Sequence, residues 1–252
     1  MDALIIAAGY GSRLRDISES KPLTPVAGIS LLELGARQAA AAGANNIVVV
    51  TGHRADEVEA FLPELSIRAG VPVVAARVDD WSIPNGYSVM AGAAKIAEMG
   101  GSDYLLMMAD HIFAAQILQR LAQQGAPDRG VTLGIDRRIT SELIDPDDAT
   151  WVQTDAAGFI RAIGKTIPAY DAVDVGAFLA TPELAAAIAA AIADGKSGSL
   201  SDGMQRLADA GRASTMDIGT DPFGAWWLDV DDPRAHALAE AEAPVRLAAI
   251  YG

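Results

Sequence analysis

Short apolar runs alternate with helix-length amphipathic segments along the first half of the chain. We interpret the apolar runs at 3–8, 47–50, 71–76 and 104–108 as buried strands. Helical spacing separates them at 31–42, 55–62 and 89–99, and the middle helix is expected to end before Pro63. Because strands that alternate with helices of this length form parallel sheets, the pattern predicts an open α/β sheet.

The second half changes character, because a polar, turn-rich stretch at 136–148 separates its apolar runs. Strands are predicted at 131–135, 151–154, 158–164, 174–180 and 226–230. Helices are predicted at 182–193, at 201–210 with Asp202 in the first turn, and from Pro233 onwards. No linker or repeat divides the chain, so we expect one α/β domain, residues 1–252, with a mostly parallel mixed central sheet flanked by helices.

Composition narrows the class of protein. The 252 residues include 33 acidic and 19 basic side chains, a formal charge of −14, and 51% are hydrophobic. The apolar fraction excludes a disordered chain, and the absence of cysteine excludes a disulfide scaffold, a zinc ribbon and a thiol nucleophile. The negative charge argues against nucleic acid or an anionic membrane as the main partner. It suits an enzyme whose anionic substrate arrives with a cation.

The apolar segments are too short to anchor the chain in a bilayer. The first one has no basic region before it and no cleavage site, so it is predicted to be a strand and not a signal peptide. The longest later stretch, 184–193, is well short of the ~20 residues that a span needs. We therefore expect a cytoplasmic protein that is not membrane-embedded.

A glycine-rich loop follows the first predicted strand, with the sequence Ala8-Gly9-Tyr10-Gly11-Ser12-Arg13-Leu14. Glycines there let backbone amides approach an anion, so Ala8, Gly9 and Gly11 are expected to contact a nucleotide. A dinucleotide fingerprint needs glycine in place of Leu14, and a P-loop needs Gly-Lys-Ser/Thr, so neither is predicted. Arg13 and Lys21 flank the loop and can bind a polyphosphate. A plain turn with two surface cations is the alternative.

Two aspartates that end apolar runs are candidate metal ligands. Asp110 follows 104–108, and Asp229 lies in Trp226-Trp227-Leu228-Asp229-Val230-Asp231. Ligands of open α/β sheets bind at the carboxyl ends of strands, and Mg²⁺ takes one or two carboxylates plus substrate phosphates. Each aspartate alone could be a turn former or a helix cap, and Asp231, ahead of Asp232-Pro233, is expected to be a cap. Beside the phosphate-binding loop, Asp110 and Asp229 predict a Mg²⁺ site.

Further polar residues stand where a nucleotide or an acceptor could bind. Asn85 and Gly86 stand at the start of the helix that runs to Met99. Asn85 and Ser88 could cap this helix, or Asn85 and the amide of Gly86 could hydrogen-bond a nucleobase or ribose. Lys165 ends a predicted strand and could hold a second phosphate, and Asp174 could accept a hydrogen bond from a hydroxyl. Both could equally be surface residues. His111 adjoins Asp110, although phosphoryl transfer needs no histidine.

These segments together resemble a known family. Ala-Gly-x-Gly-x-Arg-Leu followed by Lys-Pro-Leu is similar to the signature of the nucleotidyltransferases that make NDP-sugars. Asn-Gly-Tyr-Ser, Asp-His, Ile-Gly-Lys, Val-Asp-Val-Gly and Trp-x-Asp-Val-Asp follow in order, so nearly the whole chain resembles the CTP:inositol-1-phosphate cytidylyltransferases. The resemblance implies a Rossmann-like nucleotidyltransferase fold, with residues 1–125 as the nucleotide-binding half and 126–252 as the acceptor-binding half.

The resemblance also implies roles for individual residues. Arg13 and Lys21 would act on the phosphates of CTP, Asp110 and Asp229 would bind Mg²⁺, and Lys165 would bind the acceptor phosphate. The implied products are a CDP-alcohol and pyrophosphate, with inositol 1-phosphate as the best acceptor. A separate membrane CDP-alcohol phosphotransferase would then use the CDP-alcohol.

Several alternatives stay open at this point. Two stretches, 77–84 and 136–148, depart from the family pattern, so a sugar-1-phosphate, phosphocholine or a phosphonate could be the acceptor. A catalytically silent nucleotide sensor is the alternative of another class. A nicotinamide-binding dehydrogenase is a weaker one, because Leu14 replaces the glycine that it needs.

Overall fold

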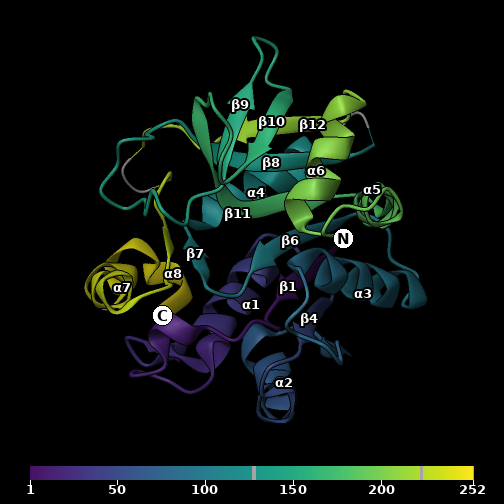
Figure 1. Cartoon of the computed structure of the whole chain (residues 1–252). Coiled ribbons are helices and arrows are strands. Elements are labelled where there is room, and N and C mark those ends of the chain that lie inside the picture. Colours follow the sequence, from purple (N-terminus) through teal and green to yellow (C-terminus); the bar gives the residue numbers. More distant parts are fainter. Residues whose placement is uncertain (127–128, 222–223, 252) are drawn as a thin grey trace.

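A nine-stranded sheet runs through both halves of the chain (Figure 1). The structure is a computed structural model that describes residues 1–126, 129–221 and 224–251. The strands of the sheet are β1 (Asp2–Ile6), β4 (Ile47–Thr51), β5 (Val73–Arg77), β6 (Tyr104–Met108), β8 (Val131–Asp136), β9 (Trp151–Thr154), β10 (Ile160–Gly164), β11 (Ala172–Ala180) and β12 (Ala213–Asp217). Their order is β10-β9-β11-β6-β1-β4-β5, and β8 pairs with β11 and β12.

The two halves of the sheet differ in strand direction. In the first half, β6, β1, β4 and β5 are parallel neighbours, as the alternation of apolar runs and helices predicts. In the second half, β11 runs antiparallel to β6, β8 and β9. The predicted α/β fold, a mixed sheet flanked by helices, is confirmed.

Helices cover both faces of this sheet. They are α1 (Leu31–Ala41), α2 (Ala55–Ala69), α3 (Asn85–Glu98), α4 (Ala115–Gln124), α5 (Pro182–Ala193), α6 (Leu200–Asp209), α7 (Pro233–Arg246) and α8 (Ala248–Tyr251). Ala3 and Ile5 of β1 belong to one core together with α1, α2 and α4, whereas Leu4 belongs to a second core with α3, α5 and α6. Successive side chains of a strand point to opposite faces, so β1 is apolar throughout.

Helix α2, helix α4 and strand β12 depart from the sequence prediction. Helix α2 does not end before Pro63 but continues through it to Ala69. The lost backbone hydrogen bond is outweighed because Leu62 and Leu65, on either side of the proline, are buried against the sheet. Helix α4 and strand β12 were not predicted, since their apolar residues are interspersed with polar ones.

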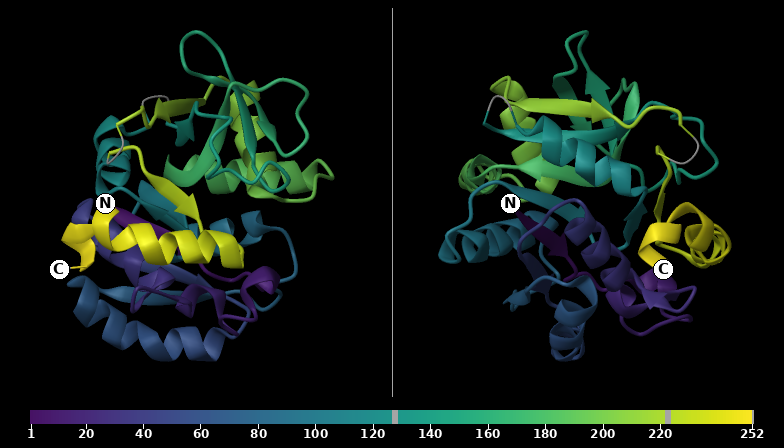
Figure 2. Two further views of the ribbon diagram at one scale, coloured as in Figure 1. Left: turned by 90° about the vertical axis from the view of Figure 1, so that its left-hand side faces the viewer. Right: turned by 180° about the vertical axis from the view of Figure 1, so that it is seen from behind.

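A third apolar core joins the two ends of the chain. Leu14, Val26 and Leu34 pack in it against residues of α7 and α8. Figure 2 shows α7, in yellow, lying across the purple N-terminal segments. The predicted C-terminal helix from Pro233 is therefore present as two helices, and Gly252 at its end lies outside the described residues. This packing brings residues near 229 close to those near 21.

Candidate active site

The glycine-rich loop leaves the carboxyl end of β1 and turns at Gly11, whose φ is 62°. A Cβ atom at Gly11 would lie 2.5 Å from Cβ of Lys21, so only glycine lets the lysine stem cross the loop. The short helices η1 (Ser12–Leu14) and η2 (Lys21–Leu23) carry the two predicted cations. Local backbone geometry thus brings Lys21 to the edge where β1 and β6 end.

Lys21 is held among carboxylates. Its side chain is only 12% exposed, and its Nζ lies 2.5 Å from Oδ2 of Asp110 and also pairs with Asp231. Burial works against ionisation of Asp110, but Lys21 and His111 outweigh it and hold the pKa of Asp110 well below its ordinary value. Asp110 is therefore a carboxylate at neutral pH.

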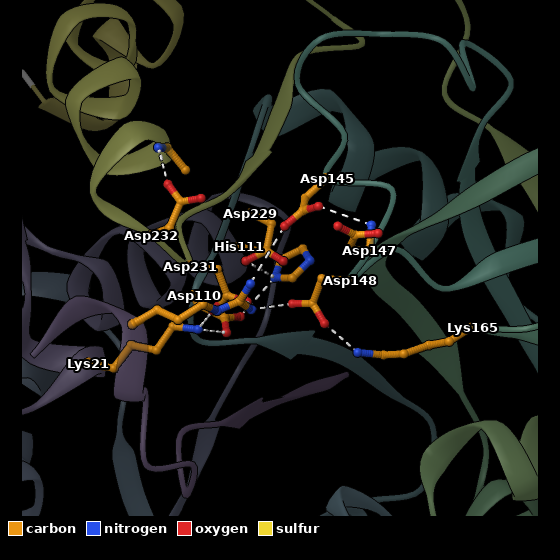
Figure 3. A network of polar contacts seen from close by, with 12 residues as sticks. Lys21, Asp110, His111, Asp145, Asp147, Asp148, Lys165, Asp229, Asp231 and Asp232 are labelled. Atoms are coloured by element: carbon orange, nitrogen blue, oxygen red, sulfur yellow. Dashed lines mark hydrogen bonds and ion pairs between the residues drawn. The ribbon is translucent and has the colours of Figure 1, made fainter.

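A two-stranded sheet brings the two predicted metal ligands together. Strand β7 (His111–Phe113) pairs antiparallel with β13 (Trp227–Asp229), and Asp229 faces His111 in the register. The amide of Val230 donates to the carbonyl of Asp110 at 2.9 Å. Asp110 and Asp229, far apart in sequence, therefore lie side by side, as Figure 3 shows.

His111 lies between these two aspartates. Its Nδ1 is 2.8 Å from Oδ1 of Asp110 and 3.7 Å from Oδ1 of Asp229. Burial disfavours the charged ring, but Asp229 and Asp110 outweigh burial and raise the pKa of His111 to about 9. The ring also stacks near Trp227 and packs on Gly176, where an added Cβ would overlap it. His111 is thus a buried cation that offsets part of the negative charge.

The carboxylate oxygens fit a divalent cation. One carboxylate oxygen each from Asp148, Asp229 and Asp231 lie within 4.8 Å of one another, and Asp110 and His111 lie equally close to Asp229. Oδ1 of Asp229 is buried and has no hydrogen-bond partner among the described residues, and burial raises the pKa of this carboxyl. A buried oxygen in that state is one that a bound cation would satisfy, and carboxylate oxygens suit magnesium.

An acidic residue that was not predicted connects the two sides of the site. Asp148, in the turn-rich segment between β8 and β9, pairs with both Arg13 and Lys165. Figure 3 shows it between Lys165 and the cluster of Asp110 and Asp229. Arg13 also forms ion pairs with Asp145 and Asp231. The only sequence signal was that this segment departs from the family pattern.

A cavity of about 950 Å³ opens at this edge of the sheet. Predicted site residues that line it are Arg13, Asn85, Asp110, Lys165, Asp174 and Asp229. Five other predicted site residues do not line the cavity, namely Ala8, Gly9, Gly11, Lys21 and Gly86. The structure therefore brings cations and carboxylates from both halves of the chain to one cavity, large enough for a nucleotide-sized ligand.

Asn85 and Gly86 connect α3 to the second half. Oδ1 of Asn85 accepts a hydrogen bond from the amide of Leu200 at 2.9 Å, whereas the residue that caps α3 is Pro84, without a side-chain bond. The expectation that Asn85 caps its own helix is wrong, because its side chain satisfies the start of α6 instead. Gly86 packs against the carbonyl of Gly198, where an added Cβ would overlap it. That either residue binds a nucleobase stays a prediction.

The second half supplies Asp174 and the cap of α7. Oδ1 of Asp174 accepts a hydrogen bond from the amide of Gly176 at 2.6 Å. Burial raises the pKa of the Asp174 carboxyl to about 6. The cap predicted at Asp231 is wrong, because the side chain of Asp232 accepts from Ala235 at 2.7 Å and begins α7. Asp231 is thereby free to pair with Lys21 and Arg13.

The helices of this chain can be compared with the length and apolarity that a membrane span requires. Across residues 1–126, 129–221 and 224–251, none is both long and apolar enough to cross a bilayer.

The chain is similar in sequence to a known family and to two curated proteins. A family described as a MobA-like NTP transferase domain matches residues 3–210. A bifunctional IPC transferase and DIPP synthase from Rubrobacter xylanophilus is 33% identical over 241 residues, 94% of this chain and 51% of the relative. Its namesake from Aquifex aeolicus is 28% identical over 234 residues, 92% of this chain and 49% of the relative. The chain spans about half the length of these curated relatives.

Two solved structures share the fold. The inositol-1-phosphate CTP transferase from T. maritima superimposes with a TM-score of 0.79 at 21% identity, over 97% of this chain and 96% of that one. A UDP-glucose pyrophosphorylase complexed with UDP-glucose gives a TM-score of 0.78 at 15% identity, over 96% and 98% of the two chains. At these identities the likeness concerns the fold alone.

Proposed function

Because the chain belongs to the family described as MobA-like NTP transferase domains, we propose that it is a cytidylyltransferase acting on a phosphorylated alcohol. CTP and the alcohol phosphate, with inositol 1-phosphate as the best candidate, give a CDP-alcohol and pyrophosphate. The observation that carries this proposal is the meeting of Arg13, Lys21, Asp110 and Asp229 in one cluster beside the cavity that Lys165 lines. The names of the relatives and of the T. maritima structure support the choice of substrates.

The reaction is an in-line displacement at the α-phosphorus of CTP. An oxygen of the acceptor phosphate forms a bond to that phosphorus, while the bond to the oxygen that bridges to the β-phosphorus breaks. The electron pair of that bond leaves with pyrophosphate. No general base is needed, because the second pKa of a phosphate monoester is about 6 and the acceptor is already a dianion near pH 7. Positioning and charge stabilisation then supply the catalysis.

The chain's own side chains share this work. Arg13 and Lys21 exchange their carboxylate partners for the triphosphate and stabilise the charge that develops on pyrophosphate. Asp110 and Asp229 would hold Mg²⁺, which, when bound, neutralises charge on the phosphate oxygens. Lys165 holds the acceptor phosphate, and Asp174 accepts a hydrogen bond from a hydroxyl of the acceptor.

Compartment and product use complete the proposal. We place the reaction in the cytoplasm, with residues 1–125 binding the nucleotide and 126–252 binding the acceptor. A membrane CDP-alcohol phosphotransferase would consume the product, and the names of both curated relatives, which join a transferase to a synthase, support such a coupling.

The test is a matrix of pyrophosphate release, with four nucleoside triphosphates against a panel of phosphorylated alcohols in the presence of Mg²⁺. We expect CTP with inositol 1-phosphate to give the largest rate. A larger rate with a sugar-1-phosphate, phosphocholine or a phosphonate would show that this compound is the acceptor, and the proposed nucleotidyl transfer would stand. A protein that binds CTP but releases no pyrophosphate with any acceptor would be a sensor, and the proposal would fail.

A further inference from the structure

Three aromatic side chains meet at the surface beside the glycine-rich loop. Tyr10, His53 and Trp81 follow the carboxyl ends of β1, β4 and β5, which are neighbours in the parallel part of the sheet. The ring centroids lie 4.8 Å apart for Tyr10 and His53, 5.0 Å for His53 and Trp81, and 5.5 Å for Tyr10 and Trp81. The rings of Tyr10 and Trp81 are stacked, with 9° between their planes.

This aromatic cluster is exposed, unlike most large apolar side chains of the molecule. Tyr10 is 36% and Trp81 is 40% exposed, whereas Trp151, Trp226 and Trp227 are buried. Stacked rings held at the surface leave apolar area in water, which is unfavourable unless a ligand covers it. Their position at the carboxyl edge of a parallel sheet is where the ligands of such sheets bind.

The two stacked rings differ in how firmly they are held. An added Cβ at Gly52 would lie 2.8 Å from Cβ of Trp81, so the stem of Trp81 packs where only glycine fits. Tyr10 stands between Gly9 and Gly11, and its hydroxyl and ring both contact Arg15. Within the described residues, no atom lies within 4 Å of a Cβ placed at Gly9. Trp81 is therefore anchored at its stem, whereas Tyr10 is held through its hydroxyl and its ring.

The neighbouring groups indicate which ligand covers the rings. The loop that carries Tyr10 continues directly into Arg13, and the segment that carries Trp81 continues into Asn85, which lines the cavity. Tyr10 and Trp81 lie outside the lining of the cavity. A Cβ added at Gly52 would meet the Cβ atoms of both Trp81 and Ala8, so the stem of Trp81 lies beside the start of the glycine-rich loop, where the base of a nucleotide with its phosphates at Arg13 and Lys21 could reach it. Flat aromatic rings bind bases by stacking, and the parallel ring of Tyr10 occupies the position that a base would take on Trp81.

We propose that Trp81 is the stacking surface for the cytosine ring of CTP and that Tyr10 leaves this surface when the nucleotide binds. The inference rests on the proposed function for the identity of the nucleotide. It assigns a binding role to the segment 77–84, which departs from the family pattern.

Fluorescence titration tests the stacking without any turnover. Wild-type protein is titrated with CTP and, separately, with inorganic tripolyphosphate, which carries the phosphates and no base. We expect CTP to quench tryptophan emission and tripolyphosphate not to, and we expect the quench to be lost in Trp81→Leu. Base stacking on an aromatic side chain predicts a loss of CTP affinity of about 5- to 150-fold in Trp81→Leu. The affinity for tripolyphosphate should stay within about twofold.

A second stacked pair, in which only one ring is exposed, provides the control. Trp151 and Tyr170 are stacked with centroids 4.2 Å apart, and Tyr170 is 43% exposed. Tyr170→Leu should leave CTP affinity unchanged, whereas Trp81→Phe, which keeps a ring, should restore most of what Trp81→Leu loses. An equal loss in Trp81→Leu and Tyr170→Leu, or an equal quench by CTP and tripolyphosphate, would overturn the inference.

Failure of this inference is distinguishable from failure of the proposed function. Pyrophosphate release from CTP with an unchanged CTP affinity in Trp81→Leu would leave the function standing and remove the stacking role. A quench by CTP but not by tripolyphosphate, without pyrophosphate release, would support the stacking role of Trp81 and contradict the proposed function.

Discussion

The proposed nucleotide side and the proposed acceptor side of the site are built in different ways. On the nucleotide side, parallel strands β1 and β6 end a few residues before the glycine-rich loop and Asp110, so the sheet itself sets their positions. On the acceptor side, the turn-rich segment between β8 and β9 reaches over the cavity and brings in Asp148. Lys21 is 12% exposed, whereas Lys165 on the other side is 58% exposed.

This difference shows how charge is shared across the cavity. The nucleotide side buries its ions in a cluster where each has a fixed partner, Lys21 with Asp110 and Asp231. The acceptor side relies on one carboxylate, Asp148, to hold Arg13 and Lys165 together. Substrate phosphates must therefore compete with Asp148 for both cations, so the two sides are coupled through a single side chain.

The largest expected effect is on turnover, at the nucleotide side. Asp110→Asn removes one of the paired carboxylates and should lower pyrophosphate release by about 100-fold or more, since preorganised charge is worth that much in active sites. The unfolding transition, followed by circular dichroism, should remain cooperative. Near-normal turnover in this variant would contradict the assignment of Asp110.

The next effect is on stability, at the junction of the two sides. Gly176 has a φ of 74° and lies against the ring of His111, so Gly176→Ala adds both backbone strain and an overlap with the ring. We expect a loss of about 2–4 kcal/mol in the free energy of unfolding, measured with urea.

Gly43→Ala is the control for backbone strain alone. Its φ is 93°, and no described atom lies within 4 Å of an added Cβ. The expected loss is about 1–2 kcal/mol. Equal losses at the two glycines would mean that the overlap with the His111 ring costs no stability. The close contact between Gly176 and His111 would then not help to hold the two sides together.

The third effect is on acceptor binding. Lys165→Ala should raise the KM for the acceptor about tenfold, because a charge-assisted contact with phosphate is lost, while the KM for CTP changes less than threefold. Lys95, which pairs with Glu98 on the outer surface of α3, provides the control, and Lys95→Ala should change neither value. A larger change for CTP than for the acceptor would reverse the assignment of sides.

The smallest effect tests the coupling. Asp148→Asn keeps the shape of the side chain but removes the charge that competes with substrate, so the KM values for CTP and for the acceptor should both fall, by about two- to fivefold. Initial rates of pyrophosphate release at limiting substrate measure both. A rise in either KM would show that Asp148 assists binding instead of opposing it.

The same contrast explains how much the sequence could predict. Asp110 follows the apolar strand β6, and the pattern alone places such a residue at the carboxyl edge of the central sheet. Asp229 instead ends β13, and the pattern does not predict that β13 pairs with β7 in a separate two-stranded sheet. The predicted membership of the nucleotidyltransferases is confirmed by the family match over residues 3–210. These predictions depend on local periodicity and on motifs, which a single sequence contains.

Residues that depend on tertiary packing could not be predicted. Asp148 reaches Arg13 because Leu143 and Ile144, earlier in its segment, pack against two different cores. The cap of α7 was assigned one residue too early, since Asp231 and Asp232 are the same residue type and only the folded site uses one of them for Lys21. The hydrophobic periodicity of the sequence gives no signal for either of these tertiary contacts.

The ladder between β7 and β13 has a consequence for the order of folding. Asp110 is synthesised long before Asp229, and the two meet only when the segment that carries β13 pairs with β7 and α7 packs over the N-terminal segments. The cation site is thus complete only when both of these contacts have formed. A ligand that bridges both aspartates would slow the detachment of α7, so proteolytic cleavage near the C-terminus would report occupancy of a site at the other end of that helix.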